Sequence, residues 1–328
     1  MKREFGQLSH WWNGSFSQIK DYYCSRKYNG WSALWDGGIS IGIPSHKIPW
    51  FKKDKSVVST GLWSLGRNNN PDVINAPPFF TEMLPKGIPL HGELWYKDRL
   101  DVIKKTCGTK KLFEPMWTNV KFMMFHIKPY SKWLLDLNHK TTTAIAEFTQ
   151  KLKDSEYWDA ERYEKIYGIM KNIETNDTLQ LVTSLKLETL EDLKAMQKAS
   201  IENRWEGLMF ANPNGLYECG RSYNTLKWKG VCETEAIVEG YGDGKTGKNI
   251  GKTGSIQAHL EWGEQVLSIF GGRPDMIGEE ARFNIGGLTD LERINTHEHY
   301  PIGSKIKFTF FGVSTHGVPQ NCNIYRSL

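Results

Sequence analysis

The sequence predicts an α+β fold of two domains, with a mixed first domain over residues 1–232 and a small β-barrel over residues 233–328. Two observations carry this prediction. The 328 residues exceed the ~100–200 residues typical of one domain. The character of the chain also changes near Cys232, after which short alternating strands are separated by glycine turns, a pattern typical of a small barrel.

The composition excludes a disordered chain. Apolar residues make up 39% and charged residues 24%, with 13 Trp, 13 Tyr and 15 Phe, which is too apolar and too aromatic for disorder. No run approaches the ~20 apolar residues of a membrane-spanning helix, and the first residues lack the apolar segment of a secretory signal. We therefore expect a cytoplasmic protein with no membrane partner.

Cysteine usage and charge narrow the function classes further. The cysteines Cys24, Cys107, Cys219, Cys232 and Cys322 are far apart and form no CxxC pair, so reduced thiols are expected and neither a disulfide framework nor a zinc knuckle is indicated. A net charge of +5 and a pI near 8.7 permit a polyanionic partner without requiring one.

The elements of the first domain follow from local patterns. Residues 26–43 alternate in strand fashion around Asp36-Gly37-Gly38, which predicts a β-hairpin with Lys27 at the end of its first strand. Further along, the patterns predict a proline-rich loop at 71–89 with a short helix at 79–84, strands at 90–97 and 120–127, amphipathic helices within 131–175 and an apolar run at 179–187.

A helix, a strand and a basic run complete this domain. Thr189 precedes Asp192 by three residues, a capping pattern, and apolar residues follow on one helical face. Residues 206–213 predict a strand that ends in the turn-forming segment 212–215, and the basic run 221–230 follows. In the second domain, the period-two alternation around Phe308 predicts a strand with one buried face.

Several residues have the types that phosphate chemistry needs. Lys27 precedes Gly30, where an amine could act as a nucleophile and the backbone could approach a phosphate closely. Glu93 and Glu206 are bracketed by glycine and apolar residues, and such carboxylates could bind a sugar hydroxyl and a divalent metal. In isolation, a surface lysine before a turn or a glutamate at a strand edge explains each of them equally well or better.

Lys227 and Lys229 alternate with apolar residues. On one strand both amines would face the same side and could clamp a phosphate, although a solvated face is an equal interpretation of this short pattern.

In order and content these segments resemble the covalent nucleotidyltransferase superfamily, and most closely its minimal two-domain ATP-dependent DNA ligases. Five family motifs match in the family's order. They are motif I at Lys27-Tyr28-Asn29-Gly30, motif III at 90–95, motif IIIa at 121–125, motif IV at 206–209 and motif V at 226–229.

The resemblance implies an adenylation domain of antiparallel sheets with flanking helices over 1–232, followed by an OB-fold DNA-binding domain over 233–328. The C-terminal match covers 235–256, 285–295 and 301–319. It places the chain with ligases in particular and not with nucleotidyltransferases in general.

The resemblance also implies residue roles. Lys27 would be the nucleophile that forms lysine-AMP, and Lys227 and Lys229 would act on the phosphate oxygens and, with a metal, favour the unprotonated amine. The expected nucleotide contacts are Lys27, Arg67, Glu93 to the ribose, Phe125 stacked on adenine, Glu206, Lys227, Lys229 and Arg326. The expected metal ligands are Glu206 and Glu93, and the expected DNA contacts are Arg221, Lys245, Lys248 and Lys252.

The implied activity is the sealing of 5′-phosphate/3′-hydroxyl nicks in duplex DNA, with ATP and Mg²⁺ as cofactors and Mn²⁺ as an alternative ion. We expect a monomer from a bacterium, a virus-infected cell or an organelle. An RNA ligase or an RNA-capping guanylyltransferase would share the same lysine chemistry. A barrel that only binds nucleic acid would explain the C-terminal domain alone.

The chain departs from the family pattern at several places, one of which is a segment at residues 262–282 that is longer than the corresponding turn in the smallest ligases. Asn29 replaces the usual Asp of motif I, Ser32 replaces an Arg, and His91 replaces the Asp that often begins motif III. Motif VI is shortened so that only Arg326 can be carried over. We therefore expect the contacts to the ribose to be rearranged.

Overall fold

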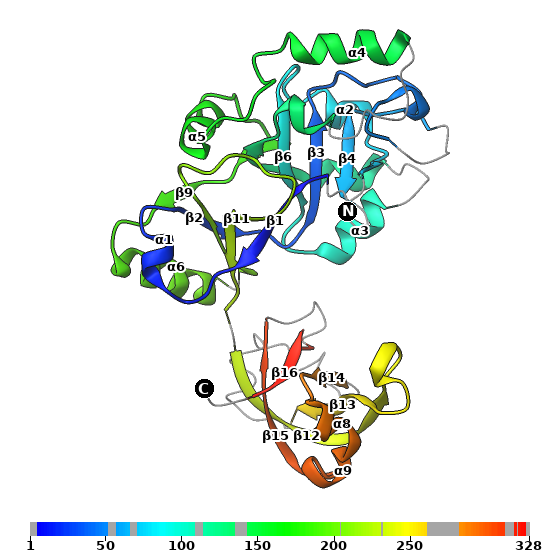
Figure 1. Cartoon of the computed structure of the whole chain (residues 1–328), viewed down its shortest axis with the longest axis vertical. Coiled ribbons are helices and arrows are strands. Elements are labelled where there is room, and N and C mark those ends of the chain that lie inside the picture. The colour runs from blue at the N-terminus through cyan, green and yellow to red at the C-terminus, as the bar shows by residue number, and fades with distance from the viewer. Residues whose placement is uncertain are drawn as a thin grey trace. The chain divides into compact units, whose positions relative to one another are not determined.

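The computed structural model describes residues 5–51, 57–65, 71–108, 114–134, 143–203, 205–230, 232–260, 282–311, 318–319 and 321–325. The chain divides into two compact units, residues 1–228 and 229–328 (Figure 1). The boundary expected near Cys232 lies a few residues beyond this division. None of the described helices has the length and apolar character needed to cross a bilayer.

The first unit is built on two β-sheets. One has the strand order β1-β11-β10-β2-β9 and the other the order β5-β4-β3-β6-β7-β8. The first comprises β1 (Gln7–Trp11), β2 (Tyr23–Lys27), β9 (Ser184–Lys186), β10 (Gly207–Ala211) and β11 (Gly220–Trp228). The second comprises β3 (Trp31–Asp36), β4 (Leu62–Leu65), β5 (Pro71–Val73), β6 (Pro89–Trp95), β7 (Lys121–Ile127) and β8 (Leu179–Leu181).

The hairpin predicted over residues 26–43 is wrong. β2 and β3 belong to different sheets, since β2 pairs with β10 and β9 while β3 pairs with β4 and β6. Residues 28–30 cross between the sheets, and the segment after Asp36 forms turns in which Gly37 and Gly38 both adopt φ +77°. A strand pattern shows that a segment is extended but not which partner it pairs with.

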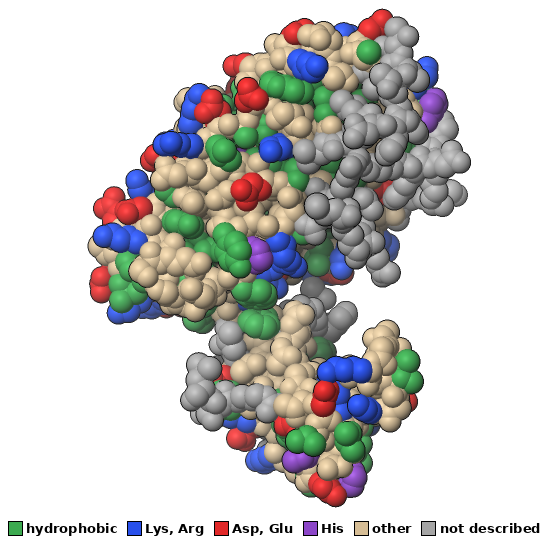
Figure 2. Space-filling model, viewed as in Figure 1, with side chains coloured by type: hydrophobic (Ala, Val, Ile, Leu, Met, Phe, Trp, Pro, Cys, Tyr) green, Lys and Arg blue, Asp and Glu red, His purple; other side chains and the backbone are tan. Residues whose placement is uncertain are grey.

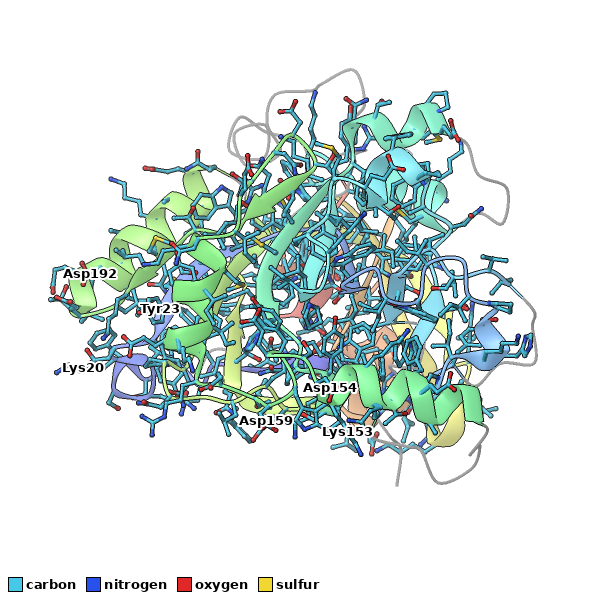
Figure 3. All side chains as sticks on the ribbon, turned by 90° about the horizontal axis from the view of Figure 1, so that it is seen from above. Lys20, Tyr23, Lys153, Asp154, Asp159 and Asp192 are labelled. Atoms are coloured by element: carbon cyan, nitrogen blue, oxygen red, sulfur yellow. The ribbon has the colours of Figure 1, made fainter. Side chains whose placement is uncertain are left out.

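Helices cover the sheets of this unit (Figure 1). The described α-helices here are α1 (Phe16–Ile19), α2 (Pro78–Thr81), α3 (Leu100–Cys107), α4 (Thr143–Lys153), α5 (Tyr163–Lys171) and α6 (Leu190–Glu202). The predicted capping box of α6 is confirmed, because the Thr189 hydroxyl accepts from the Asp192 N–H and the Asp192 carboxylate accepts from the Thr189 N–H. Figure 3 labels Asp192 at this end of α6, and Lys153 and Asp154 at the end of α4.

The core of the first unit is rich in aromatic side chains. Trp35, Trp117 and Phe122 are fully or almost fully buried in the cluster beneath the six-stranded sheet. A second cluster forms around Trp50, Trp63 and other aromatic rings. Ala33 and Trp35 of β3 pack in the first cluster and Leu34 of the same strand packs in the second, so both faces of the six-stranded sheet are fixed by close packing.

The second unit is the predicted β-barrel, and the prediction is confirmed by a closed strand order β12-β13-β14-β16-β15. Its strands are β12 (Cys232–Asp243), β13 (Thr253–Leu260), β14 (Phe283–Gly286), β15 (Lys305–Phe310) and β16 (Cys322–Ile324), with the short helices α8 (Asp290–Ile294) and α9 (Thr296–His299). The alternation along β15 has the expected effect, since Ile306, Phe308 and Phe310 are all buried. This is the architecture of a small five-stranded OB-type barrel.

Candidate active site

A pocket of about 320 Å³ lies within the first unit, lined by residues from both sheets. The five-stranded sheet contributes side chains from β1, β2, β10 and β11, and the six-stranded sheet contributes Ser32, His91, Glu93 and Phe125. Titratable side chains gathered in an enclosed pocket are the usual mark of a catalytic or binding site.

Lys27 lines this pocket and is in contact with Glu206. The Lys27 Nζ donates to Glu206 Oε2 at 2.5 Å, and both side chains are about one-fifth exposed. The register explains the contact, because Lys27 at the end of β2 is paired with Gly207, the first residue of β10. The two residues that motifs I and IV nominate are therefore direct neighbours.

Glu93 approaches the same pair from the other sheet. Burial is the largest cause that raises the pKa of this half-buried carboxyl to about 8, and the charge of Glu206 adds to it, whereas Lys27 and the Gly30 N–H oppose the shift. The effects of Lys27 and Glu206 on the Glu93 carboxyl are those expected of charged groups close to it.

Lys227 lies on the same face of the five-stranded sheet. It is paired with Met209, which is paired in turn with Ser25, and directly paired residues of antiparallel strands project to the same side. The Lys227 Nζ lies 4.8 Å from the centre of the Trp11 ring, a cation–π arrangement. Lys27 and Lys227 therefore line one pocket.

Lys229 does not share a strand with Lys227 as the sequence pattern predicted. β11 ends at Trp228, and Lys229 is the first residue of the second unit. The alternation was interpreted as one continuous strand, but the chain leaves the sheet between the two lysines.

Phe125 lines the pocket next to His91, with ring centroids 4.6 Å apart and the ring planes at 50°. His91 is buried, and burial, together with the charges of His126 and Lys128, lowers its pKa well below the ordinary value. The imidazole is therefore neutral. Its Nε2 lies 3.0 Å from Ser32 Oγ and its Nδ1 lies 2.9 Å from the Tyr217 hydroxyl.

Arg221, expected near DNA, lies on β11 with an exposed side chain that also lines the pocket. Its guanidinium donates to the Ser9 carbonyl at 3.1 Å. Nearby, His10 and Tyr223 stack with ring centroids 3.9 Å apart. On the face drawn in Figure 2, basic side chains lie among acidic ones instead of forming one continuous stripe.

The other expected DNA contacts are placed in the second unit. Lys245, Lys248 and Lys252 all belong to the β12–β13 connection or its edge. The Lys248 ammonium donates to Asp290 Oδ2 at 2.8 Å, with both side chains exposed. Arg67 and Arg326 lie outside the described residues.

Ser32, His91 and Tyr217 are site residues that sequence reasoning did not assign. Ser32 and His91 stood out only as departures from family motifs, and their contact could not be read from positions 59 residues apart. Tyr217 carried no signal beyond its place between motifs IV and V.

Glu93 and Glu206 are the residues expected to hold a divalent cation, and each of them interacts with Lys27. Within the described ranges, no group of three or more His, Cys, Asp or Glu side chains is arranged to hold a metal. Two carboxyl groups are nevertheless a suitable partial ligand set for Mg²⁺, which typically takes one or two carboxylates and completes its coordination with water and substrate phosphates.

Comparison with known proteins supports the resemblance. No protein-family model matches the chain. Over 235 residues it is 23% identical to the DNA ligases of Enterobacteria phages T6 and T4, an alignment that covers 67% of this chain and 46% of each relative. The matched region thus spans about half the length of these curated relatives.

Solved structures show the same architecture. One described as part of a structure–function analysis of Lig E DNA ligases, with DNA binding by a minimal scaffold, has a TM-score of 0.66 at 23% identity and covers 98% of both chains. Another, described as Pmar-Lig_PreS3, has a TM-score of 0.59 at 18% identity and covers 98% of this chain and 67% of its own.

The chain combines a first unit built on two β-sheets with a second unit that is a closed five-stranded barrel. Its fold is that of the Lig E DNA ligases, and the resemblance to DNA ligases that the ordered motifs indicate is confirmed by fold and by sequence similarity.

Proposed function

We propose that this protein is an ATP-dependent DNA ligase that seals 5′-phosphate/3′-hydroxyl nicks through lysine-AMP and adenylated DNA. The observation that carries the proposal is that Lys27 and Lys227 from one sheet and Glu93 from the other line one pocket, while Glu206 contacts the Lys27 amine. An amine between carboxylates and beside a second cation is suited to attack a phosphate ester of a nucleotide.

In the first step, the Lys27 Nζ attacks the α-phosphorus of ATP. The N–P bond forms as the bond between the α-phosphorus and the bridging oxygen breaks, and pyrophosphate leaves with that electron pair. The amine must lose a proton, and Glu206 Oε2 lies at hydrogen-bond distance to accept it. Lys227 offsets the charge that develops on the phosphate oxygens.

Phe125 offers the ring face on which adenine stacks, and the pocket volume suits a nucleotide. Glu206 and Glu93 would hold a divalent cation, which when bound supplies positive charge to the phosphate oxygens. Lys229, Arg67 and Arg326 remain proposed nucleotide contacts by resemblance.

In the two later steps, AMP passes from Lys27 to the 5′-phosphate at a nick, and the 3′-hydroxyl attacks that phosphorus and releases AMP. Each step makes one P–O bond and breaks one bond at phosphorus. Arg221 and the lysines of the barrel are proposed to contact the DNA backbone, which basic side chains recognise without regard to sequence. We propose that the protein acts as a monomer.

The test is incubation with α-labelled ATP or GTP and Mg²⁺, a denaturing gel, and then addition of nicked DNA or nicked RNA. Label from ATP that is absent in Lys27→Ala and is discharged as nicked DNA is sealed would establish the proposal. Label from GTP would instead indicate a capping enzyme, and discharge only on RNA would indicate an RNA ligase.

A further inference from the structure

Two residues at which this chain departs from the family motifs are in contact with each other. Ser32 of β3 and His91 of β6 are joined by a 3.0 Å contact between Ser32 Oγ and His91 Nε2. The other ring nitrogen of His91 also has a partner, because the Tyr217 hydroxyl lies 2.9 Å from Nδ1. The Gln7 backbone N–H donates to the same hydroxyl at 3.1 Å.

The hydrogen-bond pattern assigns the protons along this chain of contacts. The Tyr217 oxygen accepts from Gln7, so its own proton is available to His91 Nδ1. With Nδ1 as the acceptor, the single proton of the neutral imidazole lies on Nε2, from which it can be donated to Ser32 Oγ at 3.0 Å. A serine that accepts from His91 has its own O–H proton left for another acceptor, and Ser32 lines the pocket.

The position of Ser32 indicates which part of a nucleotide it meets. Ser32 is paired directly with Glu93 across β3 and β6, so the two side chains share one face. On one side, the pKa of Glu93 is lowered by the charge of Lys27. On the other side, the His91 ring lies against Phe125. In a nucleotide the sugar joins the phosphate to the base, so a donor between the nucleophile and the stacking ring faces the sugar.

We propose that Ser32, oriented by His91 and Tyr217, donates a hydrogen bond to a ribose hydroxyl of the nucleotide and so helps the pocket select ribonucleotides over deoxyribonucleotides. His91 and Tyr217 are positioning residues that fix the direction of the serine proton. A neutral hydroxyl thus performs the recognition at this position without a charged side chain. This inference rests on the proposed function, since it places the phosphate at Lys27 and the base at Phe125.

The test measures nucleotide binding separately from catalysis. Lys27→Ala provides a background in which lysine-AMP cannot form, and calorimetry gives the Kd for ATP, 2′-deoxy-ATP and 3′-deoxy-ATP. Ser32→Ala should weaken ATP binding about 10-fold, the effect of one hydrogen bond. For the analogue that lacks the contacted hydroxyl, the same substitution should change Kd less than about 2-fold.

Two further variants separate a hydrogen bond from a packing effect. Ser32→Thr retains the hydroxyl and should restore ATP binding, and His91→Gln retains a donor near the Nε2 position and should weaken binding less than His91→Phe. Ser64→Ala, which removes a buried hydroxyl from the neighbouring strand β4 outside the pocket, is the matched control and should bind like the parent.

The inference is overturned if Ser32→Ala weakens all three nucleotides by the same factor, or if it weakens none. If ATP binds but never labels Lys27 in the otherwise unaltered protein, the proposed ligase function fails while the binding series still decides the role of Ser32. If that protein binds no ATP, both proposals fail.

Discussion

The Lys27 ammonium and the Glu206 carboxylate are in direct contact at 2.5 Å, although 179 residues separate them in the sequence. The pairing of β2 with β10 brings them together, since Lys27 is opposite Gly207. In the proposed mechanism the Lys27 nitrogen attacks phosphorus with a lone pair, and this contact places an acceptor for its proton at hydrogen-bond distance.

Lys27→Arg should abolish covalent nucleotide labelling while leaving the protein folded. The guanidinium retains the charge that Glu206 needs as its partner, but it is too weak a nucleophile to form the N–P bond. Intact-mass spectrometry under denaturing conditions should show one added AMP in the parent and none in the variant. A labelled Lys27→Arg protein would show that another residue is the nucleophile.

Lys27→Ala should be less stable than Lys27→Arg because it removes the ammonium in contact with the Glu206 side chain, which is about one-fifth exposed. Removing one partner of a partly buried ion pair costs more than the pair contributes. Thermal unfolding of the two variants, measured without nucleotide, should give a midpoint lower by a few degrees for the alanine variant. Equal midpoints would contradict the importance of the contact for stability.

Lys227→Met should slow the labelling step about 100-fold, the usual effect of removing one charged group that stabilises a transition state. Methionine keeps the apolar stem beside Trp11, so the fold and much of the nucleotide binding should persist. Single-turnover labelling at saturating ATP measures the rate. Lys186→Met on β9 is the control, because it removes an exposed amine paired with Glu164 from the same sheet. A rate similar to that of this control would exclude Lys227 from the chemistry.

Asp290→Asn should strengthen DNA binding. Asp290 is paired with Lys248 at 2.8 Å, and its removal both frees the ammonium and deletes a negative charge near the proposed phosphate contacts. The dependence of log K on log salt should steepen by up to about one ion. Fluorescence anisotropy with nicked duplex DNA at several salt concentrations measures both effects. Unchanged affinity in Asp290→Asn and in Lys248→Ala would remove this lysine from the interface.

The buried amine of Lys128 should make stability depend on pH. Its Nζ donates to the Phe5 carbonyl at 2.7 Å, and burial lowers the pKa of Lys128 to about 7, with Cys219 acting in the opposite direction. Above pH 7 the folded protein releases this proton, whereas the unfolded chain holds it until about pH 10.4. The unfolded state binds more protons in this window, so stability rises with pH there.

Lys128→Met should remove this rise. Cys219 Sγ still donates to the Phe5 carbonyl at 3.3 Å, so that acceptor keeps a partner. Urea unfolding at pH 7 and pH 9 should show that the free energy of unfolding of the parent gains ~1–2 kcal/mol relative to the variant. Parallel pH profiles would show that Lys128 does not change its protonation on unfolding.

Local patterns predicted the elements whose structure is decided locally. The capping box at Thr189 and the alternation around Phe308 depend on neighbours within a few residues, and both are confirmed. The hairpin at residues 26–43 failed because strand pairing depends on partners far along the chain, here β10 for β2 and β6 for β3.

The candidate site likewise combines features that local sequence predicts with features that depend on distant partners. Motif order nominated Lys27, Glu93, Glu206 and Lys227, and the structure brings all four together. The order of the motifs did not reveal that Lys229 lies beyond the end of the strand, nor that Ser32 and His91 contact each other. A contact between two unusual residues is visible only when register is known, because each departure alone gives no indication of a partner.

Strand β1 pairs in parallel with β11, and Gln7 lies opposite Gly220. This pairing has a consequence for folding of the nascent chain. A ribosome adds about 5–20 residues per second, so the strand bearing Lys27 emerges many seconds before β10 and β11 exist to flank it. Until Trp228 has been translated, the five-stranded sheet is incomplete and the pocket has only part of its walls. A truncated chain ending within α6 would thus carry the motif I lysine without Glu206 or Lys227, and nucleotide binding during synthesis could not guide the early stages of folding.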